Sequence, residues 1–120
     1  QTYLPAVATT LNNLANLQKD RNDFEAAEQG YQEALQIRRE LARTNPQTYL
    51  PAVAMTLINI GIFYLEAMPD RKQSLACVTE ALRIILPAAD HLPYIKKYKD
   101  AALQVAKAWG IDPEKFITQL

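Results

Sequence analysis

Apolar residues recur at three- and four-residue steps along most of the chain, as they do on one face of an amphipathic helix. In residues 2–20 this face consists of Val7, Leu11, Leu14 and Leu17, with Ala8 and Ala15 beside them. In residues 23–44 it consists of Phe24, Ala27, Tyr31, Ala34, Leu35, Ile37 and Leu41. The pattern therefore predicts two antiparallel helices joined by a polar turn at residues 21–23.

The predicted helix ends carry suitable boundary residues. Thr2 is expected to cap the first helix, and Pro5 falls in its first turn, where a missing N–H costs little. Asn22 or Asp23 is expected to cap the second helix, and Glu25 lies three residues after Asn22, in capping-box register.

A second helical pair follows the first. The first pair should end before Asn45 and Pro46, and a helix is predicted to start again at Thr48. Asp70 is expected to cap its partner helix, which should end at Pro87. The first helix of this pair is apolar nearly all round, as buried helices are, with Met55, Leu57, Ile58, Ile60, Ile62, Phe63, Tyr64 and Leu65. The second carries Leu75, Val78, Ala81, Leu82 and Ile85 on one face.

The two pairs are copies of one unit. QTYLPAVA at residues 1–8 recurs at residues 47–54, and EAL at 33–35 recurs at 80–82, so the offset grows from 46 to 47. One residue is therefore inserted in the second inter-helix turn. A self-similar period of this size is typical of a helical solenoid. We divide the chain into unit 1 (1–46), unit 2 (47–89) and a degenerate or truncated third unit with capping helices (90–120).

The third unit follows the pattern less faithfully. DHLP at residues 90–93 repeats the spacing of TYLP and predicts another helix start. The expected buried face is Tyr94, Ile95, Tyr98, Ala102, Val105 and Trp109. Gly110 is expected to end this helix, and Asp112 with Pro113 to begin a last one. This unit is either a natural cap or a cut repeat, and the opening of the chain inside a recurring motif favours a piece of a longer array.

Residues at the predicted helix crossings are similar to those of a known repeat family. Leu11, Leu14 and Ala15, followed by Ala27, Tyr31 and Ala34, resemble the tetratricopeptide repeat, which places small residues where its helices cross. Ser74 and Val78 of unit 2 depart from its usual Ala and aromatic residue. TLNNLANL at residues 10–17 is more specifically similar to the kinesin light chain type. The resemblance implies an all-α solenoid of antiparallel hairpins with a right-handed superhelical twist, used as a scaffold for binding proteins.

Composition and charge narrow the class of partner. Thirteen basic and thirteen acidic residues give a formal net charge of zero, so no global field favours nucleic acid or an anionic membrane. No run of about 18 consecutive apolar residues predicts a membrane span. Cys77 is the only cysteine, which excludes an internal disulfide and favours a reducing compartment such as the cytoplasm.

The resemblance also implies a binding surface on the concave face, which the first helix of each unit lines. The corresponding positions are Thr9, Asn12, Asn13, Asn16 and Lys19 in unit 1 and Met55, Ile58, Asn59, Ile62 and Glu66 in unit 2. Asn13 and Asn59 occupy equivalent positions and could hydrogen-bond the backbone of an extended peptide, because an amide both donates and accepts. The candidate peptide-binding residues are Asn12, Asn13, Asn16, Met55, Ile58, Asn59 and Ile62.

Plainer interpretations of these features remain open. Asn13 and Asn59 could bond within the solenoid or meet water, and the stripe of Met55, Ile58 and Ile62 is more typical of core than of a groove floor. The lysines of the third unit are more typical of a solvated face than of a site for an acidic tail: Lys96, Lys97, Lys99 and Lys107. A clamp for a C-terminal carboxylate is not expected, because Asn12 stands where that clamp needs Lys.

Little in the sequence indicates catalysis. His91, the only histidine, follows Asp90 in a predicted loop and is interpreted as a cap-region residue. Cys77 falls beside a buried helix face, where a thiol usually packs as a small hydrophobe. Three glycines form no phosphate-binding loop, and no Cys/His spacing indicates a metal. We therefore expect no enzyme and no cofactor.

The predicted function is the binding of a protein segment on the concave face. Two alternatives remain. The first is an architectural spacer that oligomerises through exposed repeat ends. The second is a regulatory sensor array within a larger multidomain signalling protein.

Overall fold

Six α-helices and one short 3-10 helix make up the part of the chain that the computed structural model describes, residues 3–88 and 93–120. In chain order they are α1 (Leu4–Asp20), α2 (Phe24–Thr44), α3 (Pro46–Glu66), α4 (Arg71–Ile85), η1 (Leu86–Ala88), α5 (Pro93–Ala108) and α6 (Pro113–Thr118). Three residues with predicted roles lie outside the described residues: Thr2 as a helix cap, and Asp90 and His91 in the loop before α5.

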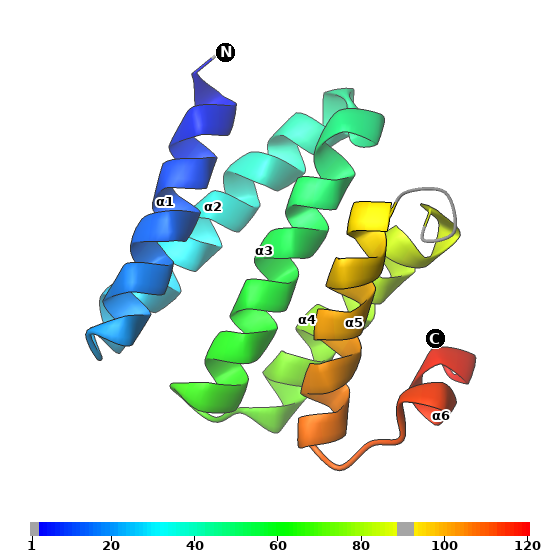
Figure 1. Cartoon of the computed structure of the whole chain (residues 1–120). Helices are drawn as coiled ribbons and strands as arrows, with labels where there is room; N and C mark the ends of the chain where they lie inside the picture. Colours follow the sequence, from blue (N-terminus) through cyan, green and yellow to red (C-terminus); the bar gives the residue numbers. More distant parts are fainter. Residues whose placement is uncertain (1–2, 89–92) are drawn as a thin grey trace.

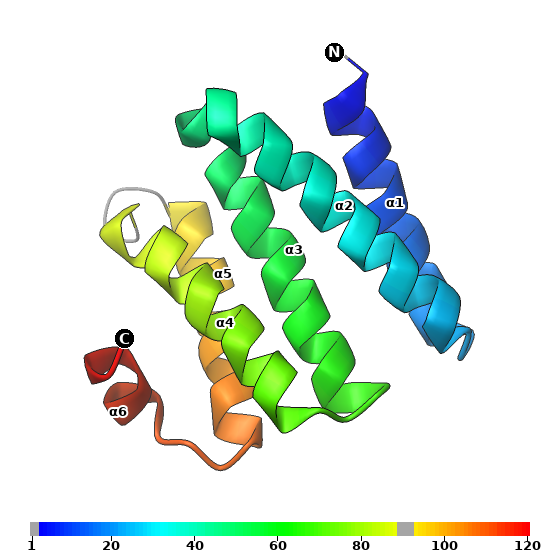
Figure 2. The same cartoon turned by 180° about the vertical axis from the view of Figure 1, so that it is seen from behind.

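The helices pack as antiparallel hairpins in two layers. Figure 1 shows α1, α3 and α5 side by side in one layer, and Figure 2, seen from behind, shows α2 and α4 in front of them. Within the hairpins α1 packs on α2 and α3 packs on α4, while α3 also contacts α2 and α5. The predicted all-α stack of helical hairpins is confirmed.

α3 starts earlier than predicted. It begins at Pro46 and not at Thr48, because Asn45 is the capping residue: its side-chain oxygen accepts a hydrogen bond from the N–H of Thr48 at 3.3 Å. Proline is tolerated at a helix start, where its N–H would lack an intrahelical acceptor. α2 ends at Thr44 as predicted, so Asn45 alone separates the two helices.

The first turn of the chain also differs from its prediction. Asp23 holds the N-cap position of α2 without a side-chain hydrogen bond, so the predicted capping box is not formed. Asn22 adopts a left-handed conformation with φ of 63°, which reverses the chain and which Asn tolerates better than most residues. By contrast, Asp70 caps α4 as predicted, accepting from the N–H of Gln73 at 3.1 Å.

α3 is the core helix. Val53, Leu57, Ile60 and Phe63 are at most 2% exposed, because α3 packs against α2, α4 and α5. A window of this helix has a mean hydropathy of 1.5, sufficient by length and composition for a membrane span. The sequence expectation that no segment qualifies is therefore wrong, because it counted only unbroken apolar runs. Half of that window is buried among the neighbouring helices, and this packing accounts for its apolar composition.

Glycines set the closest approach within each hairpin. A Cβ atom added to Gly30 on α2 would lie 3.2 Å from the Cβ of Ala15 on α1. One added to Gly61 on α3 would lie 2.7 Å from Cγ1 of Val78 and 3.3 Å from the carbonyl oxygen of Ser74 on α4. In both hairpins the two helices therefore cross at a glycine. In unit 1 this glycine lies on the second helix, and in unit 2 it lies on the first.

α5 is tied to the second hairpin through a buried serine. The indole Nε1 of Trp109 donates to Oγ of Ser74 at 2.8 Å, and that hydroxyl donates to the carbonyl oxygen of Gly61 at 2.7 Å. Ile95, Ala102 and Val105 are buried as predicted, and Tyr98 and Trp109 are half-buried. Tyr94 is 52% exposed; its predicted burial is wrong, because the adjacent Ile95 takes the inward position.

The last helix starts and ends as its boundary residues predict. Gly110 has a φ of 86°, which turns the chain after α5, and glycine adopts this conformation without steric cost. Asp112 caps α6, accepting a hydrogen bond from the N–H of Glu114 at 3.1 Å.

Candidate functional site

A cavity of about 310 Å³ lies on the layer of α1, α3 and α5. All seven predicted residues line it: Asn12, Asn13 and Asn16 from α1, and Met55, Ile58, Asn59 and Ile62 from α3. Lys97, Tyr98 and Ala101 from α5 complete the lining. We call this cavity the groove. The structure thus brings together residues from three consecutive units.

A chain of hydrogen bonds runs behind the groove wall. Asn12 is only 3% exposed, and its Oδ1 accepts from the hydroxyl of Thr56 at 3.4 Å and from Nδ2 of Asn59 at 3.2 Å. The hydroxyl of Thr56 accepts in turn from Arg38 at 2.7 Å. These bonds join α1 to α3 and α3 to α2, and so fix the orientation of the asparagine amides.

Each groove asparagine keeps part of its amide available. The phenol of Tyr31 donates to Oδ1 of Asn16, and burial, with Asp20 nearby, raises the pKa of Tyr31 to about 12, so this phenol stays a donor at neutral pH. Within the described residues, no side-chain hydrogen bond engages Nδ2 of Asn12 or Asn16, Oδ1 of Asn59, or any amide atom of Asn13. The groove therefore presents both donors and acceptors.

An ion pair spans one end of the predicted surface. Nζ of Lys19 on α1 lies 2.8 Å from Oε1 of Glu66 on α3. Both residues were predicted to face the groove, and the structure pairs them with each other. Thr9, also predicted there, lies farther toward the start of α1, where its hydroxyl donates to the carbonyl oxygen of Pro5 at 3.0 Å.

Arg38 is a functional candidate that sequence reasoning missed. It is 4% exposed, and it donates to the carbonyl oxygen of Ala52 at 3.2 Å and to the hydroxyl of Thr9 at 3.3 Å, besides Thr56. Burial lowers the pKa of Arg38, and the Tyr98 phenol opposes this shift. A signal was present, because position 38 continues the buried series Ala27, Tyr31, Ala34 and Ala42 at helical spacing.

Sequence reasoning also missed the residues that α5 contributes to the groove lining. The phenol of Tyr98 donates to Sδ of Met55 at 3.6 Å and so joins α5 to α3 across the groove. Tyr98 was predicted as core and Lys97 as part of a solvated face. Their place in the lining depends on how α5 packs, which the weakly repeated third unit did not specify.

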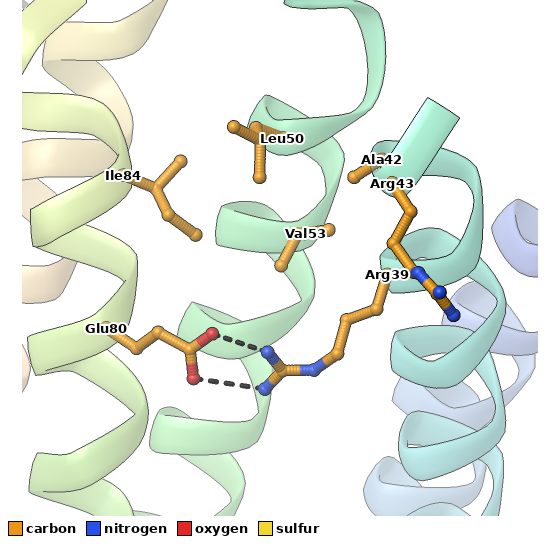
Figure 3. A pocket seen from close by; sticks show the side chains of 7 residues that line it. All are labelled: Arg39, Ala42, Arg43, Leu50, Val53, Glu80 and Ile84. Carbon is orange, nitrogen blue, oxygen red and sulfur yellow. Dashed lines mark hydrogen bonds and ion pairs between the residues drawn. The ribbon is translucent and has the colours of Figure 1, made fainter. Parts of the chain in front are cut away.

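A second cavity, of about 420 Å³, lies on the opposite layer between α2 and α4, over α3. Figure 3 shows Arg39 on α2 reaching across α3 to Glu80 on α4, with N–O distances of 2.6 and 3.0 Å. The hydrogen bond to Glu80 raises the pKa of Arg39. Leu50, Val53, Ala42 and Ile84 supply apolar lining. Because the charges of Arg39 and Glu80 pair with each other, this cavity is a weaker candidate for a binding site than the groove.

The described residues give little support to catalysis. Burial raises the pKa of the Cys77 thiol to about 11, so the nucleophilic thiolate is scarce at neutral pH. Within residues 3–88 and 93–120, no group of three or more His, Cys, Asp or Glu residues could hold a metal ion.

Comparisons with known proteins identify one repeat. Residues 7–43, which span α2 and most of α1, match the tetratricopeptide repeat family. Repeats of this kind generally mediate protein–protein interactions and are typically non-catalytic. Neither the curated proteins nor the solved structures that were compared match the chain.

Proposed function

We propose that the groove binds an extended segment of a partner protein. The supporting observation is the convergence, at one cavity, of four asparagines whose amide groups are partly unused. Every residue of an extended segment except proline carries one backbone N–H and one C=O that need partners. The free amide nitrogen of Asn16 suits a carbonyl group, and the free oxygen of Asn59 suits an N–H, whereas Asn12, at 3% exposed, holds Asn59 in place from behind.

The apolar part of the groove lining would select the side chains of the bound segment. Met55 and Ile62 are half-buried beside the asparagines, and Met is flexible enough to fit varied partners. Ile58 is 4% exposed and therefore supports the floor more than it offers contact area.

We further propose that the repeats are of the kinesin light chain type and act in the cytoplasm. TLNNLANL at residues 10–17 supports the subtype, because Asn12 and Asn13 followed by Leu14 and Ala15 resemble that type of repeat. The single Cys77 supports a reducing compartment.

Removing the groove amides should weaken peptide binding. Peptides selected from a displayed random library on the immobilised full chain serve as probes, with affinities measured by isothermal titration calorimetry. Asn13→Ala and Asn59→Ala should each raise Kd by about three- to tenfold, because each removes one hydrogen bond. Gln36→Ala, which removes an exposed amide from α2, is the control. Unchanged affinity in the double Asn variant would eliminate the proposed site.

The architectural alternative is supported by a bare apolar face on α1. Val7, Leu14 and Leu17 are 37%, 45% and 45% exposed, whereas their equivalents Val53, Ile60 and Phe63 are at most 2% exposed. α2 packs on α3 in unit 2, and none of the described helices covers the corresponding face of α1. A helix equivalent to α2, from another unit or another copy, could pack there.

Sedimentation velocity tests this alternative. If copies associate through α1, the sedimentation coefficient should rise with concentration, and Leu14→Gln with Leu17→Gln should abolish the rise. A strict monomer over the whole concentration range would rule out self-assembly through this face.

A further inference from the structure

The bare face of α1, at one edge of its layer (Figure 1), carries a cavity of about 310 Å³. We call it the α1 cavity, and its lining consists of Tyr3, Ala6, Val7, Thr10 and Leu11. At the offset of 46 between the two units, each of these five residues is identical to its counterpart on α3, namely Tyr49, Ala52, Val53, Thr56 and Leu57. The same surface therefore occurs twice in the chain, open on α1 and covered on α3.

In unit 2 an arginine of α2 occupies this surface. Nη1 of Arg38 donates to the carbonyl oxygen of Ala52 at 3.2 Å and to the hydroxyl of Thr56 at 2.7 Å. Arg38 and Thr56 are both buried, so the guanidinium fills the place that the alanine and the threonine leave open. On α1 the corresponding acceptors are the carbonyl oxygen of Ala6 and the hydroxyl of Thr10.

The third unit shows that the side chain at this place varies with the surface that it meets. At the offset of 42 between TYLP at residues 48–51 and DHLP at residues 90–93, Tyr94 and Tyr98 replace Ala52 and Thr56. At the offset of 47 between α2 and α4, Ile85 replaces the arginine, and it lines one cavity together with Tyr94. Two tyrosines take up the space that alanine and threonine leave open, so a shorter side chain fits opposite them. Because α1 has the alanine and the threonine, its cavity matches an arginine.

The rest of the bare face matches the aromatic residues of α2. The ring of Phe63 on α3 contacts Phe24 and Tyr31 at centroid distances of 6.2 and 5.7 Å, and its counterpart on α1 is Leu17, which is 45% exposed. Phe24, Tyr31 and Arg38 follow one another at seven-residue steps and therefore lie on one face of α2. A helix with this pattern, antiparallel to α1, would cover Leu17 with its aromatic side chains and fill the α1 cavity with its arginine.

We propose that the α1 cavity receives the arginine of a further unit of the same repeat, on a helix that packs on α1 as α2 packs on α3. Ala6 and Thr10 accept hydrogen bonds from its guanidinium, and Leu17 packs against its aromatic residues. Burying an arginine against a surface without such acceptors is costly, so the cavity also determines which helix can pack there. This inference is independent of peptide binding in the groove, and it names the occupant of the bare α1 face.

The test adds a copy of residues 1–46 in front of Gln1 of the full chain. The new junction reads TNPQTYLPAVA, the sequence already present at residues 44–54, so no linker is introduced. In this extended chain, Thr10→Val in the original unit 1 should lower the melting temperature by about 3–6 °C, because the buried arginine of the added unit loses a partner. In the unmodified chain Thr10 is exposed, and the same substitution, between two β-branched residues, should change the melting temperature by no more than about 1 °C.

The extended chain contains its own controls. Thr10→Val in the added unit changes the same residue at the uncovered end of the array, so it should have no more effect than in the unmodified chain. Arg38→Ile in the added unit installs the residue found at position 85 and should abolish the effect of Thr10→Val, which a double-mutant cycle measures. Leu17→Ala in the original unit 1 reports packing without the arginine, and it should lower the melting temperature more in the extended chain than in the unmodified one.

Three results would overturn the inference. If Leu17→Ala becomes more damaging in the extended chain and Thr10→Val does not, the added helix covers α1 without using the cavity. If neither substitution becomes more damaging, the added unit does not pack on α1. Unmodified chains that associate through Leu14 and Leu17 would assign this face to a second copy. The calorimetric test of the groove is separate from all three, so the peptide-binding function stands or fails by itself.

Discussion

Replacing Phe63 by alanine is expected to lower the free energy of unfolding by about 3–5 kcal/mol, the range for a fully buried aromatic residue. Phe63 is 0% exposed. Its ring makes edge contacts with Phe24, Tyr31 and Tyr64 at centroid distances of 6.2, 5.7 and 5.3 Å. The contacts with Phe24 and Tyr31 join α3 to α2, so the substitution weakens the interface between the two hairpins. Urea unfolding followed by circular dichroism measures the change.

Leu17→Ala is the matched control. Leu17 occupies the position equivalent to Phe63 in unit 1 but is 45% exposed, so its substitution should cost no more than about 1 kcal/mol. Equal losses at the two positions would contradict the conclusion that the outer face of α1 is uncovered.

Gly61→Ala is expected to destabilise the protein by about 1–3 kcal/mol, as overpacking of a core does. Alanine favours a helix over glycine by about 1 kcal/mol, so the expected loss opposes helix propensity. The added methyl group would meet Cγ1 of Val78 at 2.7 Å, and the branched side chain of Val78, fully buried on α4, cannot move aside freely. Thermal unfolding by circular dichroism provides the measurement.

A second substitution tests the mechanism. Val78→Ala removes the clashing atom, so adding Gly61→Ala to that background should cost less than it does in the unmodified chain. A Gly61→Ala variant more stable than the unmodified protein would show that the helices do not approach so closely.

Most of the fold follows from the sequence. The three- and four-residue spacing around Tyr31 and Leu57 is enough to specify helices, and the copied QTYLPAVA string specifies that two hairpins stack alike. Helix ends were less predictable. Both Asn45 and Thr48 are good capping residues, and the choice between them depends on the direction in which the chain leaves α2.

The groove could be predicted only in part. Equivalent positions in two units gave Asn12, Asn13 and Asn59, because the repeat places them on the same helix face. Lys97 could not be assigned, because the packing of α5 has no faithful copy elsewhere in the chain. Arg38 was overlooked because a charged residue is expected outside, although its spacing from Ala34 and Tyr31 points inward.

The bond between Trp109 and Ser74 has a spectroscopic consequence. Trp109 is the only tryptophan, and its indole is held at the crossing of α3 and α4, far along the chain from the first hairpin. The fluorescence of Trp109 should therefore change when α5 detaches from unit 2, and it should not respond to changes in α1. In a solenoid each unit contacts only its neighbours. Emission that changes before the loss of helical ellipticity would thus reveal unravelling from the C-terminal side.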